Sequence, residues 1–427
     1  MSAATTPRLT GTEVCALRDL RLRPRGRPAS GAGLLAMLVA STLPLMGCGQ
    51  YDASADERAL RRVVQSAQYD VAAKVFRNRR RLSFTGDLDS EATDHGRPGR
   101  TRPSTFAVLL RFIANNNLTR PASRLPEVKP DLAAFLSDGR VLKTIWLGHS
   151  TFLVLIGGKV ILFDPVLSDY ASPVSGFIKR FQPPVLSVSD LPDIDTIVIS
   201  HDHYDHLDYD TIVRFRGRKT RFLVPLGVGA HLRGWGIAPE HITELDWWQE
   251  VKRGELRFTL TPAQHFSGRG LTSRNATLWG SWVVRSADHR MFFSGDGGYD
   301  NHFKKIGRLF GPFDIVFLEN GQYSPDWPLI HLLPKDGARA FRDLQGKRLM
   351  PVHWGMFDLS THNWYDPIEA MSRLAKQHGF ALVAPKLGEI VDVKRDRVFP
   401  AWWRLVMHRD RPARSHRSIT PLDHTAR

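Results

Sequence analysis

Cysteine is almost absent from this 427-residue chain: only Cys15 and Cys48 occur, and both lie near its N-terminal end. The body of the chain therefore has no cysteine pair for an intrachain disulfide. It also offers no thiolate as a metal ligand or nucleophile. Any metal-dependent or hydrolytic chemistry has to rest on histidine and aspartate.

Acidic residues are in deficit, with 43 Asp and Glu against 59 Lys and Arg, a formal net charge of +16. Such a charge can indicate a nucleic-acid partner, but no basic-aromatic nucleic-acid motif occurs and the excess is concentrated near the two ends. We therefore expect no nucleic-acid partner, and an anionic membrane surface matches the charge better. With 42% hydrophobic residues, the chain can form one large single-core domain or two small ones.

The apolar stretch 31–45 is too short to cross a bilayer comfortably but has the length of a signal-peptide core. It follows an arginine-rich start and leads into a segment ending at Cys48 that resembles the lipobox of bacterial lipoproteins. Residues 1–47 are therefore predicted to be a lipoprotein-type signal segment, with Cys48 lipid-modified. This prediction places the protein in the bacterial cell envelope as a lipid-anchored lipoprotein, at the outer membrane or the periplasmic face. An ordinary signal peptide or a retained anchor is the alternative.

A dense histidine motif follows the apolar run 196–200, which is typical of a buried strand. The motif places four imidazole and carboxylate donors in one loop: His201, His203, Asp205 and His206. While the backbone stays extended, alternate side chains point the same way, so His201 and His203 face one side. Zinc prefers these donor types, and the loop has enough for one metal and part of a second. A solvated polar loop is the alternative, against which the density of histidine argues.

Three further donors stand just after an apolar strand-like run and just before a small or turn-forming residue: His265, Asp296 and His353. Taken singly, each could be an ordinary loop or core residue. Their recurrence behind the histidine motif predicts that strand ends bring them all to one sheet edge, where they complete a two-metal hydrolytic site.

Short apolar runs predict an α/β architecture from residue 141 onward. Helices are expected at residues 131–136 and 368–377, and Gly157 and Gly158 mark a hairpin turn. Strands are expected at 141–147, 152–156, 160–163, 196–200, 222–225, 258–261, 281–284, 291–293, 315–318, 348–352 and 381–384. This alternation, with donors at strand ends, indicates two sheets packed face to face and covered by helices, an αββα sandwich.

The segments before and after the predicted sandwich differ from it in composition. Residues 48–130 are polar and arginine-rich, and we interpret them as a basic tether and partial cap, with helix-like spacing from Leu60 to Val75 and at 105–115. Residues 131–398 are predicted to form the single catalytic domain. Residues 399–427 form an aromatic and basic tail, for which membrane contact and packing on the domain are both open.

The order of these motifs resembles that of the metallo-β-lactamase-fold hydrolases, and within them the N-acylphosphatidylethanolamine phospholipase D group. The strings that carry the resemblance include WLGHST (146–151), LPDIDTIVISHDHYDHLDYDT (191–211), ELDWW (244–248) and LWGSW (278–282). The resemblance implies the same αββα fold and two zinc ions per chain. It implies one zinc on three histidines, a second on an aspartate and two histidines, and a bridging aspartate. The three histidines of the first zinc are His201, His203 and His265. The ligands of the second zinc are Asp205, His206 and His353, and the bridging aspartate is Asp296.

The resemblance also implies that His331 lies beside the phosphate or head group of the substrate. The chain departs from the usual family pattern at Gly297, at residues 319–323 and at Lys335. These departures affect the expected head-group preference more than the expected metal ligands.

Two zinc ions can share a hydroxide and clamp both the attacking and leaving oxygens of a displacement, so no protein nucleophile is required. The leading prediction is a zinc-dependent phosphodiesterase of phospholipase D type that hydrolyses a membrane phospholipid such as N-acylphosphatidylethanolamine. Asp205, Asp296 and His331 are the predicted catalytic residues. Two alternatives stay open: a zinc-dependent lactonase or esterase, and a non-catalytic envelope protein with a structural metal site.

Three residues in the matched strings are predicted to orient the metal ligands from behind: His149, Asp164 and Asp208. The sequence leaves open whether iron or manganese replaces zinc, because histidine and aspartate accept all three. A homodimer is also left open.

Overall fold

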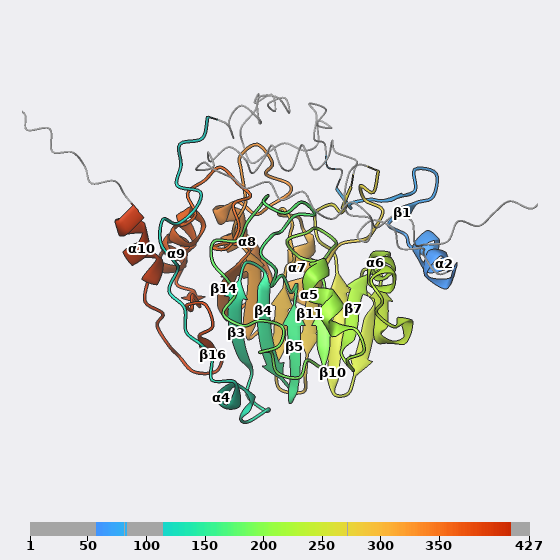
Figure 1. Ribbon diagram of the computed structural model, residues 1–427, viewed down its shortest axis with the longest axis horizontal. Helices are drawn as coiled ribbons and strands as arrows, with labels where there is room; N and C mark the ends of the chain where they lie inside the picture. Colours follow the sequence, from blue (N-terminus) through green and yellow to red (C-terminus); the bar gives the residue numbers. More distant parts are fainter. Residues whose placement is uncertain (1–56, 81, 83–113, 271, 411–427) are drawn as a thin grey trace, which may run out of the picture.

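A computed structural model describes residues 57–80, 82, 114–270 and 272–410 (Figure 1). The predicted signal segment, Cys48, most of the predicted helix at 105–115 and the tail beyond residue 410 lie outside these residues. In the described ranges, none of the helices has the length and apolar character needed to cross a membrane.

The first of two seven-stranded sheets carries the histidine motif. In spatial order its strands are β16 (Ile390–Asp392), β3 (Lys143–Gly148), β4 (Thr151–Ile156), β5 (Lys159–Phe163), β6 (Thr196–Val198), β7 (Arg221–Pro225) and β8 (Ile242–Leu245). Strands β16 to β5 pair antiparallel, and β5 to β8 pair parallel. The predicted glycine turn joins β4 to β5, where both glycines have positive φ.

The second sheet repeats this plan. Its strands are β15 (Ala381–Leu382), β14 (Arg348–Val352), β13 (Ile315–Glu319), β12 (Arg290–Phe293), β11 (Ser281–Arg285), β10 (Leu256–Thr261) and β9 (Glu250–Arg253). Strands β9 to β12 pair antiparallel, and β12 to β15 pair parallel. Parallel strands in both sheets therefore end in loops on the same edge as their neighbours, which is where ligand sites of such sheets form.

An aromatic core joins the two sheets. Phe152 of β4 stacks on Phe317 of β13 with ring centroids 4.1 Å apart, and on Phe163 of β5 at 4.6 Å. Every residue of β4 is buried because its other face meets the helix layer, which explains its continuous apolar run.

Helices cover both outer faces. The first sheet packs against α5 (Tyr209–Ile212) and α6 (Val228–Gly234), and the second against α7 (His302–Phe310), α8 (Pro334–Asp343) and α9 (Asp366–His378). Short elements complete the layer: α4 (Leu132–Leu136), η1 (Val213–Phe215) and η2 (Pro239–His241). These four layers confirm the predicted αββα sandwich. Strands β8, β9 and β16 were not predicted, because they lie at or beside sheet edges and carry few apolar residues.

The helical spacing from Leu60 to Val75 is only partly right. Helix α2 (Glu57–Gln65) ends early, and the chain then forms a hairpin of β1 (Tyr69–Asp70) and β2 (Val75–Phe76). Val71 lies in the hairpin turn and is 61% exposed. An ion pair between Arg77 and Asp70 closes the hairpin at 2.5 Å, and the fully buried Phe76 anchors it.

The described start of the C-terminal tail packs on the domain. Helix α10 (Trp402–Asp410) lies beside α9, on the side of the sandwich opposite α2 (Figure 1). Trp402 and Trp403 are each 2% exposed, and Trp403 donates a hydrogen bond to Glu369 of α9 at 2.5 Å. Membrane contact and packing on the domain were both left open for the tail that carries this tryptophan pair. In the structure, the pair packs on the domain.

Candidate metal centre

The predicted donors come together in loops at one edge of the two sheets. The loop with the histidine motif follows β6 of the first sheet. His265, Asp296 and His353 follow β10, β12 and β14 of the second. Donors separated by up to 152 residues, from His201 to His353, thus share one site.

His149 joins this set from the turn between β3 and β4. His149 and His353 have left-handed backbones, with φ of 52° and 65°. Such values are uncommon for residues other than glycine and are found at functional sites. The His353 amide donates to the His149 carbonyl at 3.0 Å, which ties the two sheets together at the site.

The first donor group consists of His201, His203 and His265. His203 Nδ1 lies 2.9 Å from His201 Nε2 and 3.3 Å from His265 Nε2. All three ring nitrogens therefore point at a common centre. This is the trio that the resemblance implies for one zinc.

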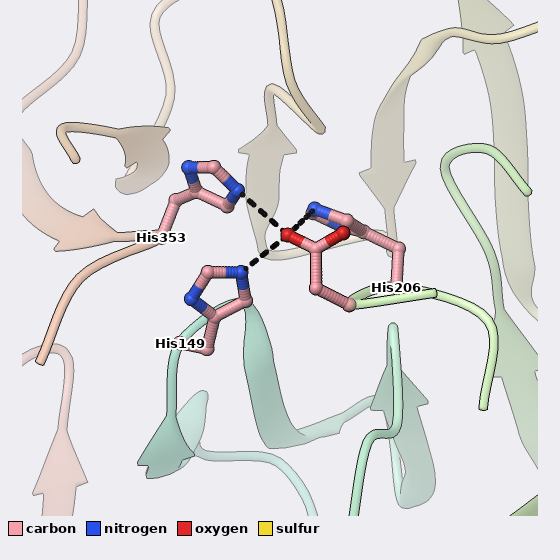
Figure 2. A group of neighbouring side chains, drawn as sticks. His149, His206 and His353 are labelled. Carbon is pink, nitrogen blue, oxygen red and sulfur yellow. Dashed lines mark hydrogen bonds and ion pairs between the residues drawn. The ribbon is translucent and has the colours of Figure 1, made fainter. Parts of the chain in front are cut away.

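The second donor group consists of Asp205, His206, His353 and His149. Figure 2 shows the three histidines converging on one carboxylate oxygen. Asp205 Oδ2 lies 2.9 Å from His149 Nε2, 3.3 Å from His353 Nε2 and 3.5 Å from His206 Nε2. The trio implied for a second zinc is thus brought together, with His149 added.

Asp296 lies between the two groups. Its Oδ2 is 3.0 Å from His353 Nε2 and 3.1 Å from His206 Nε2 in the second group. The same oxygen is 3.9 Å from the Nε2 atoms of His201 and His265 in the first group. One carboxylate thus faces both sets of ligands.

Asp164 supports the ligand rings from behind. Its Oδ2 lies 2.7 Å from His206 Nδ1, and its Oδ1 accepts the Ser200 amide hydrogen at 2.7 Å. The Ser200 hydroxyl in turn lies 2.8 Å from His201 Nδ1. Asp164 therefore holds one ligand of each group, in the supporting role predicted for it.

The supporting role predicted for Asp208 is wrong. Its carboxylate accepts hydrogen bonds from the Ser168 amide at 3.1 Å and the Thr211 hydroxyl at 2.5 Å. These bonds fix the start of α5, so Asp208 shapes the loop after the motif. Sequence position alone did not reveal that its side chain turns away from the imidazoles.

The two groups differ in charge. Burial lowers the pKa of His201 and His265 well below the usual histidine value and also lowers that of His203, which favours the neutral form of these rings. Burial also disfavours charge on His206 and His353, but the Asp296 and Asp205 carboxylates outweigh it. They raise the pKa of His206 well above its usual value and that of His353 to about 10.

The donor set fits divalent metals. His206 Nε2 and Asp296 Oδ1 are buried without a hydrogen-bond partner, and native proteins leave few buried polar atoms unpaired. In the first group, the ring nitrogen of His203 faces those of His201 and His265 at 2.9 and 3.3 Å, and the single hydrogen that it can carry cannot serve both contacts. A bound cation satisfies all these atoms, and nitrogen and carboxylate donors accept zinc, iron or manganese.

His331 lies beside both groups, in the segment before α8. Its ring centroid is 5.3 Å from that of His265 and 5.1 Å from that of His353. Its Nδ1 is 2.7 Å from Oε2 of Glu319, a fully buried carboxylate at the end of β13. Sequence reasoning missed Glu319, although an acid ending the apolar run of β13 was a usable signal.

A cavity of about 440 Å³ lies next to the first donor group. Phe266 lines the cavity and packs on the His203 ring, with centroids 4.5 Å apart. The opposite wall comes from β2 and the residues after it, where Asn78 donates to the His265 carbonyl at 2.6 Å. The lining combines apolar and basic side chains: Val75, Phe76, Leu82, Arg77 and Arg274.

Comparisons with known proteins match this picture. The family model described as the beta-lactamase superfamily domain matches residues 159–354. An uncharacterized protein of Mycobacterium tuberculosis is 43% identical over 304 residues, 70% of this chain and 81% of that protein. N-acyl-phosphatidylethanolamine-hydrolyzing phospholipase D 1 of Caenorhabditis elegans is 35% identical over 297 residues, 65% of this chain and 83% of that protein. The outer membrane protein RomA of Klebsiella pneumoniae is 46% identical over 101 residues, 24% of this chain and 76% of RomA.

The fold and the donor set define a metal-dependent hydrolase with the metallo-β-lactamase fold. The chain belongs to the beta-lactamase superfamily, in the family that includes N-acyl-phosphatidylethanolamine-hydrolyzing phospholipases D.

Proposed function

We propose that this protein is a dinuclear, zinc-dependent phosphodiesterase that hydrolyses a membrane phospholipid such as N-acylphosphatidylethanolamine, as a phospholipase D does. The observation that carries this proposal is the position of Asp296 Oδ2, within 3.9 Å of nitrogens from both donor groups. A carboxylate in that position suits two metals that act on one substrate. The name of the Caenorhabditis elegans relative supports the substrate class.

In this proposal, zinc ions supply Lewis acidity and a water of lowered pKa when bound. The residues of the chain hold the metal ligands in position and supply negative charge. Asp205 and Asp296 hold negative charge among the imidazoles, and Asp164 fixes two of the ligand rings. His331, whose side chain is 14% exposed against 1% for those of His265 and His353 beside it, can hydrogen-bond a phosphoryl oxygen of the substrate.

The cavity beside the first donor group suits a substrate with an apolar chain and an anionic group. Phe266 and Leu82, both partly exposed, offer apolar contact area. Arg274 in the same lining adds positive charge, whereas Arg77 is paired with Asp70, and this charge favours an anionic amphiphile over a small neutral ester.

We also propose that the protein acts at the bacterial envelope, anchored through a lipid on Cys48. The basic composition and the name of the outer membrane relative RomA support this location. Cys48→Ser in the full chain should move the protein from the membrane fraction to the soluble fraction. A membrane fraction unchanged by the substitution would refute the anchor.

Zinc-loaded full-length protein in mixed micelles tests the activity. N-acylphosphatidylethanolamine should yield an N-acylethanolamine and phosphatidic acid, detected by mass spectrometry, and Asp296→Ala should yield neither. A panel of lactones and carboxylic esters is the matched comparison. Turnover of that panel with no phosphodiester cleavage would overturn the proposal in favour of a lactonase or esterase.

A further inference from the structure

We propose that Glu319 is a positioning residue that holds His331 in the orientation the substrate requires. This inference rests on the proposed function, because it assigns His331 to the substrate side of the site. Glu319 itself touches neither of the two carboxylates in the centre of the site. It acts through the histidine.

Both oxygens of Glu319 hold the segment that carries His331. Oε2 lies 2.7 Å from His331 Nδ1, and Oε1 accepts the amide hydrogen of Leu332 in a very short bond. The carboxylate therefore fixes the imidazole and the adjoining backbone at once. Glu319 is 1% exposed and ends β13, a strand whose other residues are all apolar, so its own position is rigid.

The contact with Glu319 determines which side of the ring meets the substrate. With Nδ1 engaged, Nε2 is the nitrogen left for a ligand, and no partner for it is found among the described residues. The ring stacks on His353 at an interplanar angle of 19° and tilts by 59° on His265. His331 thus lies against one ligand from each donor group.

Glu319 lies behind the ligands. Its Oε2 is 3.8 Å from Nδ1 of His353, whereas His353 turns Nε2 toward Asp296 and Asp205 at 3.0 and 3.3 Å. A Glu319 oxygen also lies within 4.8 Å of ligand atoms of Asp296, His331 and His353, but both Glu319 oxygens are engaged, one by His331 Nδ1 and the other by the Leu332 amide. This geometry favours a supporting role over direct ligation.

The test is a double-mutant cycle on zinc-loaded full-length protein, with zinc content measured on every sample. Glu319→Ala should lower kcat/KM about 10- to 100-fold, as loss of a supporting partner does, without loss of zinc. Glu319→Gln, which keeps a side chain of the same shape with an acceptor for Leu332, should recover part of that loss. In a His331→Ala background, Glu319→Ala should have almost no further effect.

Glu244→Ala is the matched control. Glu244 is a buried acid, 6% exposed, whose carboxylate accepts hydrogen bonds from the Gly227 and Gly229 amides and pairs with Arg233 instead of a donor residue of the site. Its loss should lower the unfolding temperature and leave kcat/KM within about twofold. A similar fall in kcat/KM in both variants would mean that Glu319 acts only through stability.

Other outcomes separate this inference from the proposed function. The positioning role would be overturned if the losses in kcat/KM of Glu319→Ala and His331→Ala multiplied in the double variant. It would also be overturned if Glu319→Ala lost zinc. Neither result would affect the proposed function, as long as the wild type turns over its substrate. If the wild type cleaves neither phosphodiesters nor esters, the proposed function fails. Even then, crystal structures of the wild type and of Glu319→Ala test the positioning role. The His331 ring should have a different orientation in Glu319→Ala than in the wild type, and the same orientation in both would refute the inference.

Discussion

The two donor groups of the site are built differently. The first is almost local: His201 and His203 stand two residues apart, and only His265 comes from the other sheet. The second draws on the turn after β3, the motif loop and the end of β14, so it exists only when both sheets are packed together. A local histidine motif thus starts the centre, and the sandwich completes it.

The groups also differ in chemistry. The first consists of three imidazoles whose pKa values burial lowers, a set suited to zinc. The second mixes imidazoles with the Asp205 carboxylate, a set that harder ions such as manganese and iron also accept. We expect partial metal exchange to begin in the second group.

Removing the residue shared by both groups should have the largest effect. Asp296→Ala should lower phosphodiester kcat/KM about 10³-fold or more and reduce zinc from about two per chain to one or fewer. Steady-state kinetics and metal analysis of one sample measure both. Retention of about two zinc ions would show that Asp296 does not bridge.

Single-group variants should empty one group each. His203→Ala and His206→Ala should each lose one zinc and about 10²- to 10³-fold in kcat/KM, because two metals act as a unit on the substrate. His378→Ala, at the exposed end of α9, is the control and should keep both metals. If His203→Ala emptied both groups, the first group would have to fill before the second.

Removal of metal should destabilise the fold, because each donor group takes its ligands from both sheets. A ligand present at about 100 times its dissociation constant stabilises a protein by about 2.7 kcal/mol. Thermal unfolding with and without a chelator should show a fall of this order. The His206→Ala variant, which keeps the first group, should show a smaller fall, and an equal fall would argue that a metal in the second group adds nothing to the stability.

Loss of a supporting carboxylate should have the smallest effect. Asp164→Asn should lower kcat/KM about 10- to 100-fold and weaken zinc binding, since Asp164 orients ligands from both groups. Asp208→Asn, in the loop after β6, is the matched control, because its carboxylate accepts hydrogen bonds from Ser168 and Thr211 and contacts no ligand ring. The opposite ranking of these two variants would contradict the geometry.

Sequence reasoning reached the parts of this protein that periodicity and spacing encode. Most strands of the sheet interiors carry short apolar runs or alternate apolar with polar residues, and the predicted donors follow these strands, so the αββα fold and the clustering of His201 to His353 could be anticipated. The edge strand β9 could not, because its exposed and half-buried residues alternate without a strong apolar signal.

The direction of the side chains was the main feature that could not be predicted from the sequence. Asp208 and Asp164 stand in equally suggestive strings, but only Asp164 points at a ligand ring. Glu319 became meaningful only when β13 placed it behind His331. The same holds for Val71, whose helical spacing was overruled by the Asp70–Arg77 ion pair that closes a hairpin.

The most direct test of the two-group centre is zinc content per chain measured together with phosphodiester turnover on one sample of wild-type protein. The account predicts about two zinc ions per chain and cleavage of bis(p-nitrophenyl) phosphate that disappears when a chelator removes them. Full cleavage by protein that holds a single metal would contradict it.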